Sequence, residues 1–236
     1  MKCPNCSALM KSLTLDGHHG RSVAIDICQV CQAIWFDGYE SLQLSSHSVL
    51  KLFRIAAETE KVRGPISGTS ACPRCHLKLS LTKDMQRTTR FEYHSCPDRH
   101  GRLISFFNFL REKDFIRPLS ASQIEELRQN VKTINCSNCG APVDLAAGSA
   151  CAHCGSPLSM IDVKQAEALV AALQKAGASP QPVDKAALPL DLARARREVT
   201  ANFDQINPHH TWLTVVDGAD LVGSAIGFLA SFVGDS

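Results

Sequence analysis

Three groups of closely spaced cysteines dominate the sequence, and each group has the composition of a metal site. Each group consists of two knuckles. Five of the six knuckles are of Cys-x-x-Cys type, and the sixth, from Cys96 to His100, ends in histidine. Thiolate and imidazole donors in paired knuckles are typical of tetrahedral zinc sites. We therefore predict three Zn²⁺ ions. Their candidate ligands are Cys3, Cys6, Cys28 and Cys31; Cys72, Cys75, Cys96 and His100; and Cys136, Cys139, Cys151 and Cys154.

The second group offers two histidines for its fourth position. His100 lies where the last ligand of a knuckle belongs, with one extra residue in the turn. His94 lies two residues before Cys96 on an expected strand, where alternation of side chains is less suited to reaching the same ion. We favour His100 and keep His94 as the alternative.

Composition limits the class of protein. The 236 residues contain 11 cysteines, and all of them are used by the three sites. Paired cysteines of this spacing favour metal binding in a reducing cytosol over a disulfide framework. The formal charge of +2 counts cysteines as neutral, and thiolate ligands lower it, so the chain is not a strong general binder of nucleic acid.

The elements that position these ligands predict a small metal-stabilised α+β fold. We expect three tandem zinc ribbons, made of paired β-hairpins and joined by helices, followed by an apolar C-terminal helix. The expected units are residues 1–63 (first ribbon and helix), 70–133 (second ribbon and helices), 134–177 (short third ribbon and helix), 178–190 (linker) and 191–236 (helical tail). Strands are predicted at 13–17, 22–27, 77–81 and 88–93. Units this small bury little apolar surface, so metal supplies much of their folding free energy.

Capping signals place two of the helices. The sequence Asp37-Gly-Tyr-Glu40 fits a capping box, which predicts a helix to about Arg63, and Trp35 is expected to pack this helix against the first ribbon. Ser120-Ala-Ser-Gln123 opens a second, shorter helix. The aromatic cluster at 104–110 is interpreted as the core that joins the second ribbon to its helix.

The first module also resembles a known family. Its Cys-Pro-x-Cys, about 21 residues, Cys-x-x-Cys and then Trp35, Asp37 and Glu40 are similar to the transcription-factor-IIB-type zinc-ribbon domain of many small bacterial proteins. The resemblance covers residues 3–42. This sequence departs from the family pattern at Gln32 and Ala33, where two glycines are usual. It implies a structural zinc and a binding role, with no catalytic residue.

The second module is the most basic part of the chain. Its candidate nucleic-acid-binding residues are Arg87, Arg90, Arg99 and Arg102. A basic surface on one module predicts salt-dependent binding to phosphates. We keep a transcription-related regulator as the alternative function.

Residues 211–234 form the second informative stretch. Asp217 and Asp220 interrupt its apolar run, and the uncharged remainder is too short to span a bilayer. Small residues recur at every fourth position of this stretch, which favours close helix contact. We expect the segment to serve self-association, docking to a partner or attachment to a membrane surface.

Together these patterns predict a non-enzymatic adaptor that binds other proteins in the cytoplasm, with association to a membrane as an alternative. Four-ligand sites leave no open position for a substrate, and the sequence has no recognisable catalytic motif. A rubredoxin-like electron carrier with iron in place of zinc is a third hypothesis.

Overall fold

The computed structural model describes residues 1–57, 66, 68–86, 89–161 and 221–222. It is an α+β fold. The strands are β1 Lys11–Asp16, β2 Ser22–Ile27, β3 Ala33–Phe36, β4 Ser80–Gln86, β5 Thr89–Ser95, β6 Arg102–Ser105, β7 Ile116–Pro118, β8 Thr133–Asn135, β9 Pro142–Asp144 and β10 Ser159–Ile161. The helices are α1 Glu40–Gln43, α2 Ser46–Ala57, α3 Phe106–Glu112 and α4 Ala121–Asn130, with a 3₁₀ turn, η1, at His18–Gly20.

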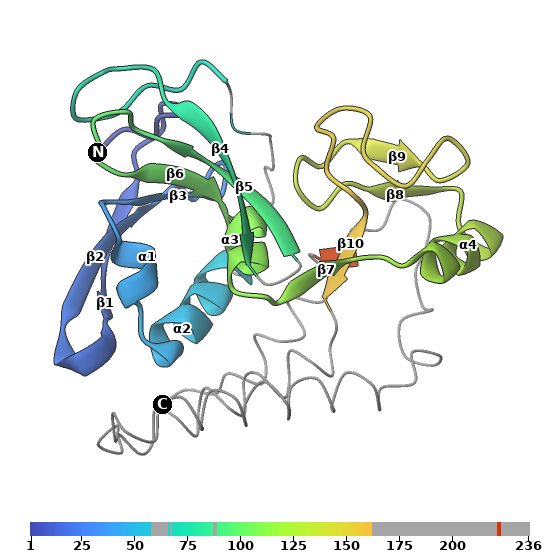
Figure 1. Ribbon diagram of the computed structural model, residues 1–236, viewed down its shortest axis with the longest axis horizontal. Helices are drawn as coiled ribbons and strands as arrows, with labels where there is room; N and C mark the ends of the chain where they lie inside the picture. Colours follow the sequence, from blue (N-terminus) through green and yellow to red (C-terminus); the bar gives the residue numbers. More distant parts are fainter. Residues whose placement is uncertain (58–65, 67, 87–88, 162–220, 223–236) are drawn as a thin grey trace.

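The first and second modules share a single antiparallel sheet of six strands in the order β1-β2-β3-β6-β5-β4 (Figure 1). The two halves meet where β3 pairs with β6, with Ile34 opposite Ile104 and Trp35 opposite Leu103. Each half contributes its three strands in the same order outward from this pair, so the sheet has an approximate two-fold arrangement. The sequence predicts these modules as separate units, whereas in the structure their strands belong to one sheet.

One face of this sheet carries the main hydrophobic core. Helices α2 and α3 supply much of it, and the Phe53 ring lies 4.4 Å from the Phe115 ring, while Phe36 stacks on Phe109 at 5.7 Å. The aromatic cluster at 104–110 is buried here, as the sequence predicts, and it contacts residues of the first module as well as its own. Burial of so many aromatic side chains stabilises the two modules as one unit.

The prediction of one continuous helix after Asp37 is wrong. Instead of one helix, α1 and α2 are separated at Leu44 and Ser45, where Leu44 is extended and bridges to Gly17. The Ser45 hydroxyl accepts a hydrogen bond from the Ser48 amide at 3.2 Å, which starts a new helix. Half of the predicted capping box forms, because the Asp37 amide donates to Glu40 Oε2 at 2.6 Å.

The third module has its own, smaller core beside the six-stranded sheet (Figure 1). It contains the hairpin β8–β9, and β10 returns to pair with β7. Helix α4 begins as predicted, since the Ser120 and Gln123 side chains form a reciprocal capping box. Strand β7 leads directly from α3, so the third module is attached to the main core through the sheet pair β7–β10.

The predicted apolar helix at 211–234 lies outside the described residues except for Leu221 and Val222. Val222 is buried in the main core, and Leu221 packs against the core of the third module. The helices expected in 162–177 and from 191 also lie outside the described residues. Among the helices that the structure describes, none combines the length and the apolar character needed to cross a membrane.

Candidate metal centres

The first centre lies at one end of the strands β1, β2 and β3. Cys3 and Cys6 precede β1, and Cys28 and Cys31 form the turn from β2 to β3. The Sγ atoms of Cys3 and Cys31 are 3.6 Å apart, and those of Cys6 and Cys28 are 3.4 Å apart. In the turn after the second knuckle Gln32 adopts a positive φ of 53°, which is uncommon for a residue other than glycine.

The second centre repeats this plan on the other half of the sheet. It brings together Cys72, Cys75, Cys96 and His100. Imidazole Nδ1 of His100 lies 3.6 Å from Cys96 Sγ and 3.9 Å from Cys72 Sγ. His94 is not in this group. It lies on β5 opposite Leu103, and its side chain is buried.

The third centre belongs to the third module. Cys136 and Cys154 have sulfurs 3.6 Å apart, and those of Cys139 and Cys151 are 3.7 Å apart. The residues after the two knuckles are Gly140 and Gly155, with φ of 77° and 70°. Glycine adopts this conformation without steric cost, and it lets the Gly140 and Gly155 amides donate back to the first carbonyl of each knuckle.

These three groups fit a tetrahedral ion with sulfur-rich ligands. In each group the four donor atoms all lie within 4.8 Å of one another. A tetrahedron with zinc–sulfur bonds of about 2.3 Å has edges of about 3.8 Å, close to the observed sulfur separations. A disulfide would require about 2.0 Å, and all 11 cysteines, each within the described ranges, are free. The donor chemistry therefore favours Zn²⁺, which each group could bind.

Burial raises the pKa of some thiols in these groups, whereas the hydrogen bond with Cys136 lowers the pKa of Cys154 to about 4. Burial raises the pKa of Cys28 to about 11, and it raises the pKa of Cys139 to about 11 as well. At neutral pH such thiols keep their protons unless a metal ion displaces them. Metal uptake by these centres is therefore coupled to proton release, and acid opposes it.

Two asparagines support the thiolates, and sequence reasoning did not single them out. The Asn138 amide donates to Cys154 Sγ at 3.7 Å, and an Asn5 hydrogen bond lowers the pKa of Cys31, although the Cys3 thiol and burial raise it overall. Both asparagines occupy the last position inside their Cys-x-Asn-Cys knuckle. The repeated asparagine inside the knuckle was the sequence signal that could have identified these residues. Hydrogen bonds to a metal-bound thiolate orient it and compensate its charge.

Trp35 does not pack against the helix that the sequence predicts. Its ring is buried in a separate cluster with Met10, Leu79 and Leu103 and with cysteines of the first and second centres. Gly101, which follows His100 of the second centre, lies so close to Trp35 that a Cβ at this position would be 2.8 Å from the indole ring. The tryptophan thus fills the space between the two centres, on the face of the sheet opposite the main core.

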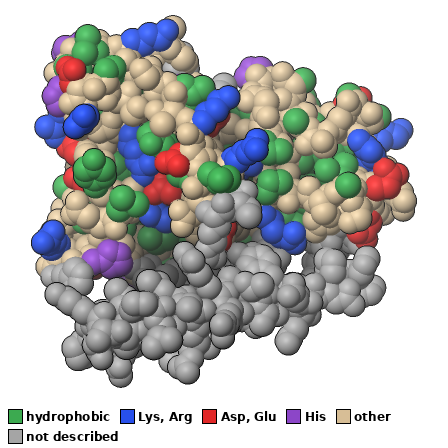
Figure 2. Space-filling view, viewed as in Figure 1, with side chains coloured by type: hydrophobic (Ala, Val, Ile, Leu, Met, Phe, Trp, Pro, Cys, Tyr) green, Lys and Arg blue, Asp and Glu red, His purple; other side chains and the backbone are tan. Residues whose placement is uncertain are grey.

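The candidate basic residues of the second module that the structure describes differ in their exposure. Arg87 lies outside the described residues, whereas Arg90 and Arg99 are exposed. Arg102 is largely buried, bonds to Glu112 Oε2 at 2.7 Å and lies over the Tyr93 ring at 4.7 Å. On the face shown in Figure 2, basic side chains are dispersed among acidic and apolar ones. Arg102 therefore has a structural role in the sheet.

Comparison of the chain with protein-family models, with curated proteins and with solved structures returned no match.

Proposed function

We propose that this chain is a non-enzymatic zinc-binding adaptor in which three zinc ribbons hold surfaces that recognise other proteins. The first ribbon would be of the transcription-factor-IIB type. One observation carries the proposal: every centre gathers four protein donors. A catalytic zinc keeps one position for water or substrate, whereas a closed set of four is characteristic of structural sites.

The joint sheet supports the same reading. Ligand residues of the first two centres flank a buried cluster that contains Trp35, so metal binding would stiffen the sheet as well as each knuckle. Rigid surfaces lose little entropy on binding, which suits a recognition module. Free thiols held for metal fit the reducing cytoplasm that we propose as its location.

Metal analysis tests the zinc part of the proposal. We expect three zinc ions per chain in protein purified without added metal, and a colourless solution. A red protein containing iron with visible absorption would instead support the electron carrier.

A pull-down with zinc-loaded full-length protein tests the adaptor part. The bait is compared with a chain that ends at Asn207, which removes the apolar segment 211–234. We expect the full-length chain to recover a protein partner or to associate with itself. Loss of this binding in the shorter chain would assign the contact to the segment 211–234. Failure to recover any partner, together with a strictly monomeric full-length protein, would refute the adaptor. Flotation with liposomes, for the same pair of chains, tests attachment to a membrane surface.

Nucleic-acid binding is the second candidate, and the exposure of Arg90 and Arg99 is the observation in its favour. It predicts binding to an oligonucleotide that falls steeply with salt and weakens in the Arg90→Gln and Arg99→Gln variants. Binding that is unaffected by salt would reject it.

A further inference from the structure

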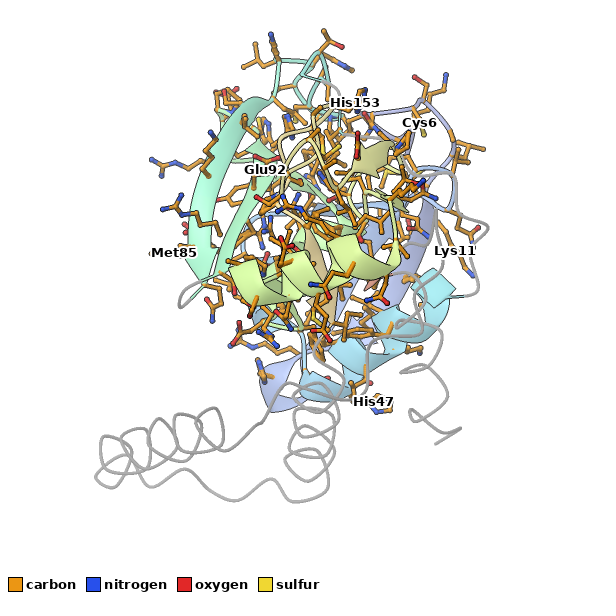
Figure 3. All side chains as sticks on the ribbon, turned by 90° about the vertical axis from the view of Figure 1, so that its right-hand side faces the viewer. Cys6, Lys11, His47, Met85, Glu92 and His153 are labelled. Carbon is orange, nitrogen blue, oxygen red and sulfur yellow. The ribbon has the colours of Figure 1, made fainter. Side chains whose placement is uncertain are left out.

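A cleft of about 690 Å³ lies between the hairpin β4–β5, helix α3 and the last knuckle of the third module. Figure 3 labels Glu92 on the hairpin, where the loops of the third module overlap it in this view, and Met85 near the hairpin's outer end. The lining residues are Lys83, Asp84, Met85, Arg90, Phe91, Glu92, Arg111, Cys154, Gly155, Ser156 and Pro157. Its volume lies within the range of about 300–1,000 Å³ typical of ligand sites.

Arg111 is the unusual residue of this cleft. It is only 5 % exposed, and its Nε atom is buried without a hydrogen-bond partner in the described part of the chain. Its guanidinium lies over the Phe107 ring at 5.3 Å. Burial lowers the pKa of Arg111, which Glu92 and the sulfurs of Cys136 and Cys154 partly offset. A buried guanidinium with an unused donor is costly to maintain, so it indicates a site for an acceptor.

Two further cations line the same cleft. Lys83 lies opposite Glu92 in the β4–β5 register, and Arg90 lies opposite Met85. The structure gives neither Lys83 nor Arg90 an ion pair with a described residue. Lys83 and Arg90 are therefore exposed cations without an ion pair among the described residues, and their charge complements an acidic group. Arg111 is buried, and the nearby Glu92 offsets part of its charge.

The remaining lining limits what that acidic group can be attached to. Asp84, Glu92 and the thiolate of Cys154 would repel a ligand with many negative charges. Met85 and Pro157 offer exposed apolar surface next to the cations, and Met85 is 58 % exposed, whereas the Phe91 side chain is buried in the main core. A single carboxylate with apolar neighbours satisfies both parts of the wall, and a protein segment supplies that combination.

We propose that this cleft is the docking site of the adaptor and that it binds a peptide segment with one Asp or Glu side chain between apolar residues. The carboxylate accepts from Arg111, with Lys83 and Arg90 at the rim. This inference rests on the proposed adaptor function and specifies the chemistry of its partner.

The test uses zinc-loaded full-length protein and synthetic peptides. The probes are heptapeptides labelled with a fluorophore at the N-terminus and amidated at the C-terminus, with a central Asp or Glu flanked by Leu, Val or Phe, each matched with the same peptide carrying Asn or Gln. Fluorescence anisotropy measures their affinity. We expect the amide peptides to bind roughly 10-fold to 100-fold more weakly, because they lose a charge-assisted hydrogen bond.

Variants separate the cleft from the rest of the surface. Arg111→Gln should weaken the binding of acidic peptides by about as much as the substitution of Asn or Gln in the peptide does. Arg90→Gln should weaken this binding by a few fold. Arg99→Gln, which changes an exposed arginine outside the cleft, should have no effect and serves as the control. Zinc content shows that each variant retains its fold, and the Arg90 variant tests the cleft if Arg111→Gln loses the third ion.

Three results would overturn the proposal: equal binding of acidic and amide peptides, unchanged binding in both the Arg111 and Arg90 variants, or an oligonucleotide that binds the cleft more tightly than any peptide. The partner from the pull-down distinguishes the two levels of the argument. If that partner is retained by Arg111→Gln and Arg90→Gln protein, the adaptor stands and the cleft is rejected as its docking site.

Discussion

The indole of Trp35 donates from Nε1 to Asp37 Oδ1 at 2.8 Å, and the other oxygen of the same carboxylate pairs with Arg74. Trp35 and Asp37 belong to the first module, and Arg74 lies inside the first knuckle of the second. Asp37 therefore links the buried cluster between two metal centres to a contact between modules.

The two bonds to Asp37 should differ in their contribution to stability. Replacing Asp37 with Ala leaves the buried indole N–H without its acceptor and should lower the free energy of unfolding by about 1–3 kcal/mol. Arg74→Ala and Asp37→Asn remove only the exposed ion pair and should cost less than about 1 kcal/mol. Urea denaturation in excess zinc measures all three. An Arg74 variant as unstable as Asp37→Ala would contradict this ranking.

The pair Ile34 and Ile104 should couple the stability of the first two modules. Both side chains are buried at the strand pair that joins the two halves of the sheet. Ile104→Ala should cost about 2–5 kcal/mol, the range for buried aliphatic truncations, and both modules should unfold in one transition. Leu81→Ala, on an exposed position of the edge strand β4, is the control and should have little effect. Two separate transitions, each assigned to one module by hydrogen exchange, would argue against a shared core.

Glu112 should be more important to stability than a surface carboxylate. It bonds to Arg102 at 2.7 Å and lies 3.3 Å from Lys113 Nζ, and all three side chains are largely buried. Glu112→Gln leaves two buried cations without a counter-charge and should cost about 3–5 kcal/mol. In thermal unfolding, the double variant Arg102→Met with Glu112→Leu should lose less than the sum of the single variants. Strict additivity would show that the two residues do not interact.

Loss of the third metal centre should affect only the core of the third module. Cys136→Ser is expected to reduce zinc from three ions to two and to unfold the third module, whose core contains three of its ligands. In a Trp212→Phe background, emission from Trp35 should stay unchanged in Cys136→Ser and change in Cys28→Ser, because Trp35 packs with ligands of the first and second centres. Equal changes in both variants would show that the three centres unfold together.

The ligands and the local helix signals could be predicted from the sequence. The twelve donors were identified by short spacings within each knuckle, and the structure brings these same residues into three groups. The capping box at Ser120 was likewise predicted correctly, because its hydrogen bonds join residues three positions apart. Such contacts depend on local chain geometry, which neighbouring residues decide.

The contacts between modules were decided only by the tertiary structure. The pairing of β3 with β6, the position of Trp35 between two centres and the burial of Arg102 against Glu112 all depend on segments far apart in the chain. Periodicity showed that strands exist, but it contains no information about which edges pair. From the sequence alone, a basic residue such as Arg102 is expected at the surface. Only the packed sheet brings Glu112 beside Arg102 and allows both side chains to be buried.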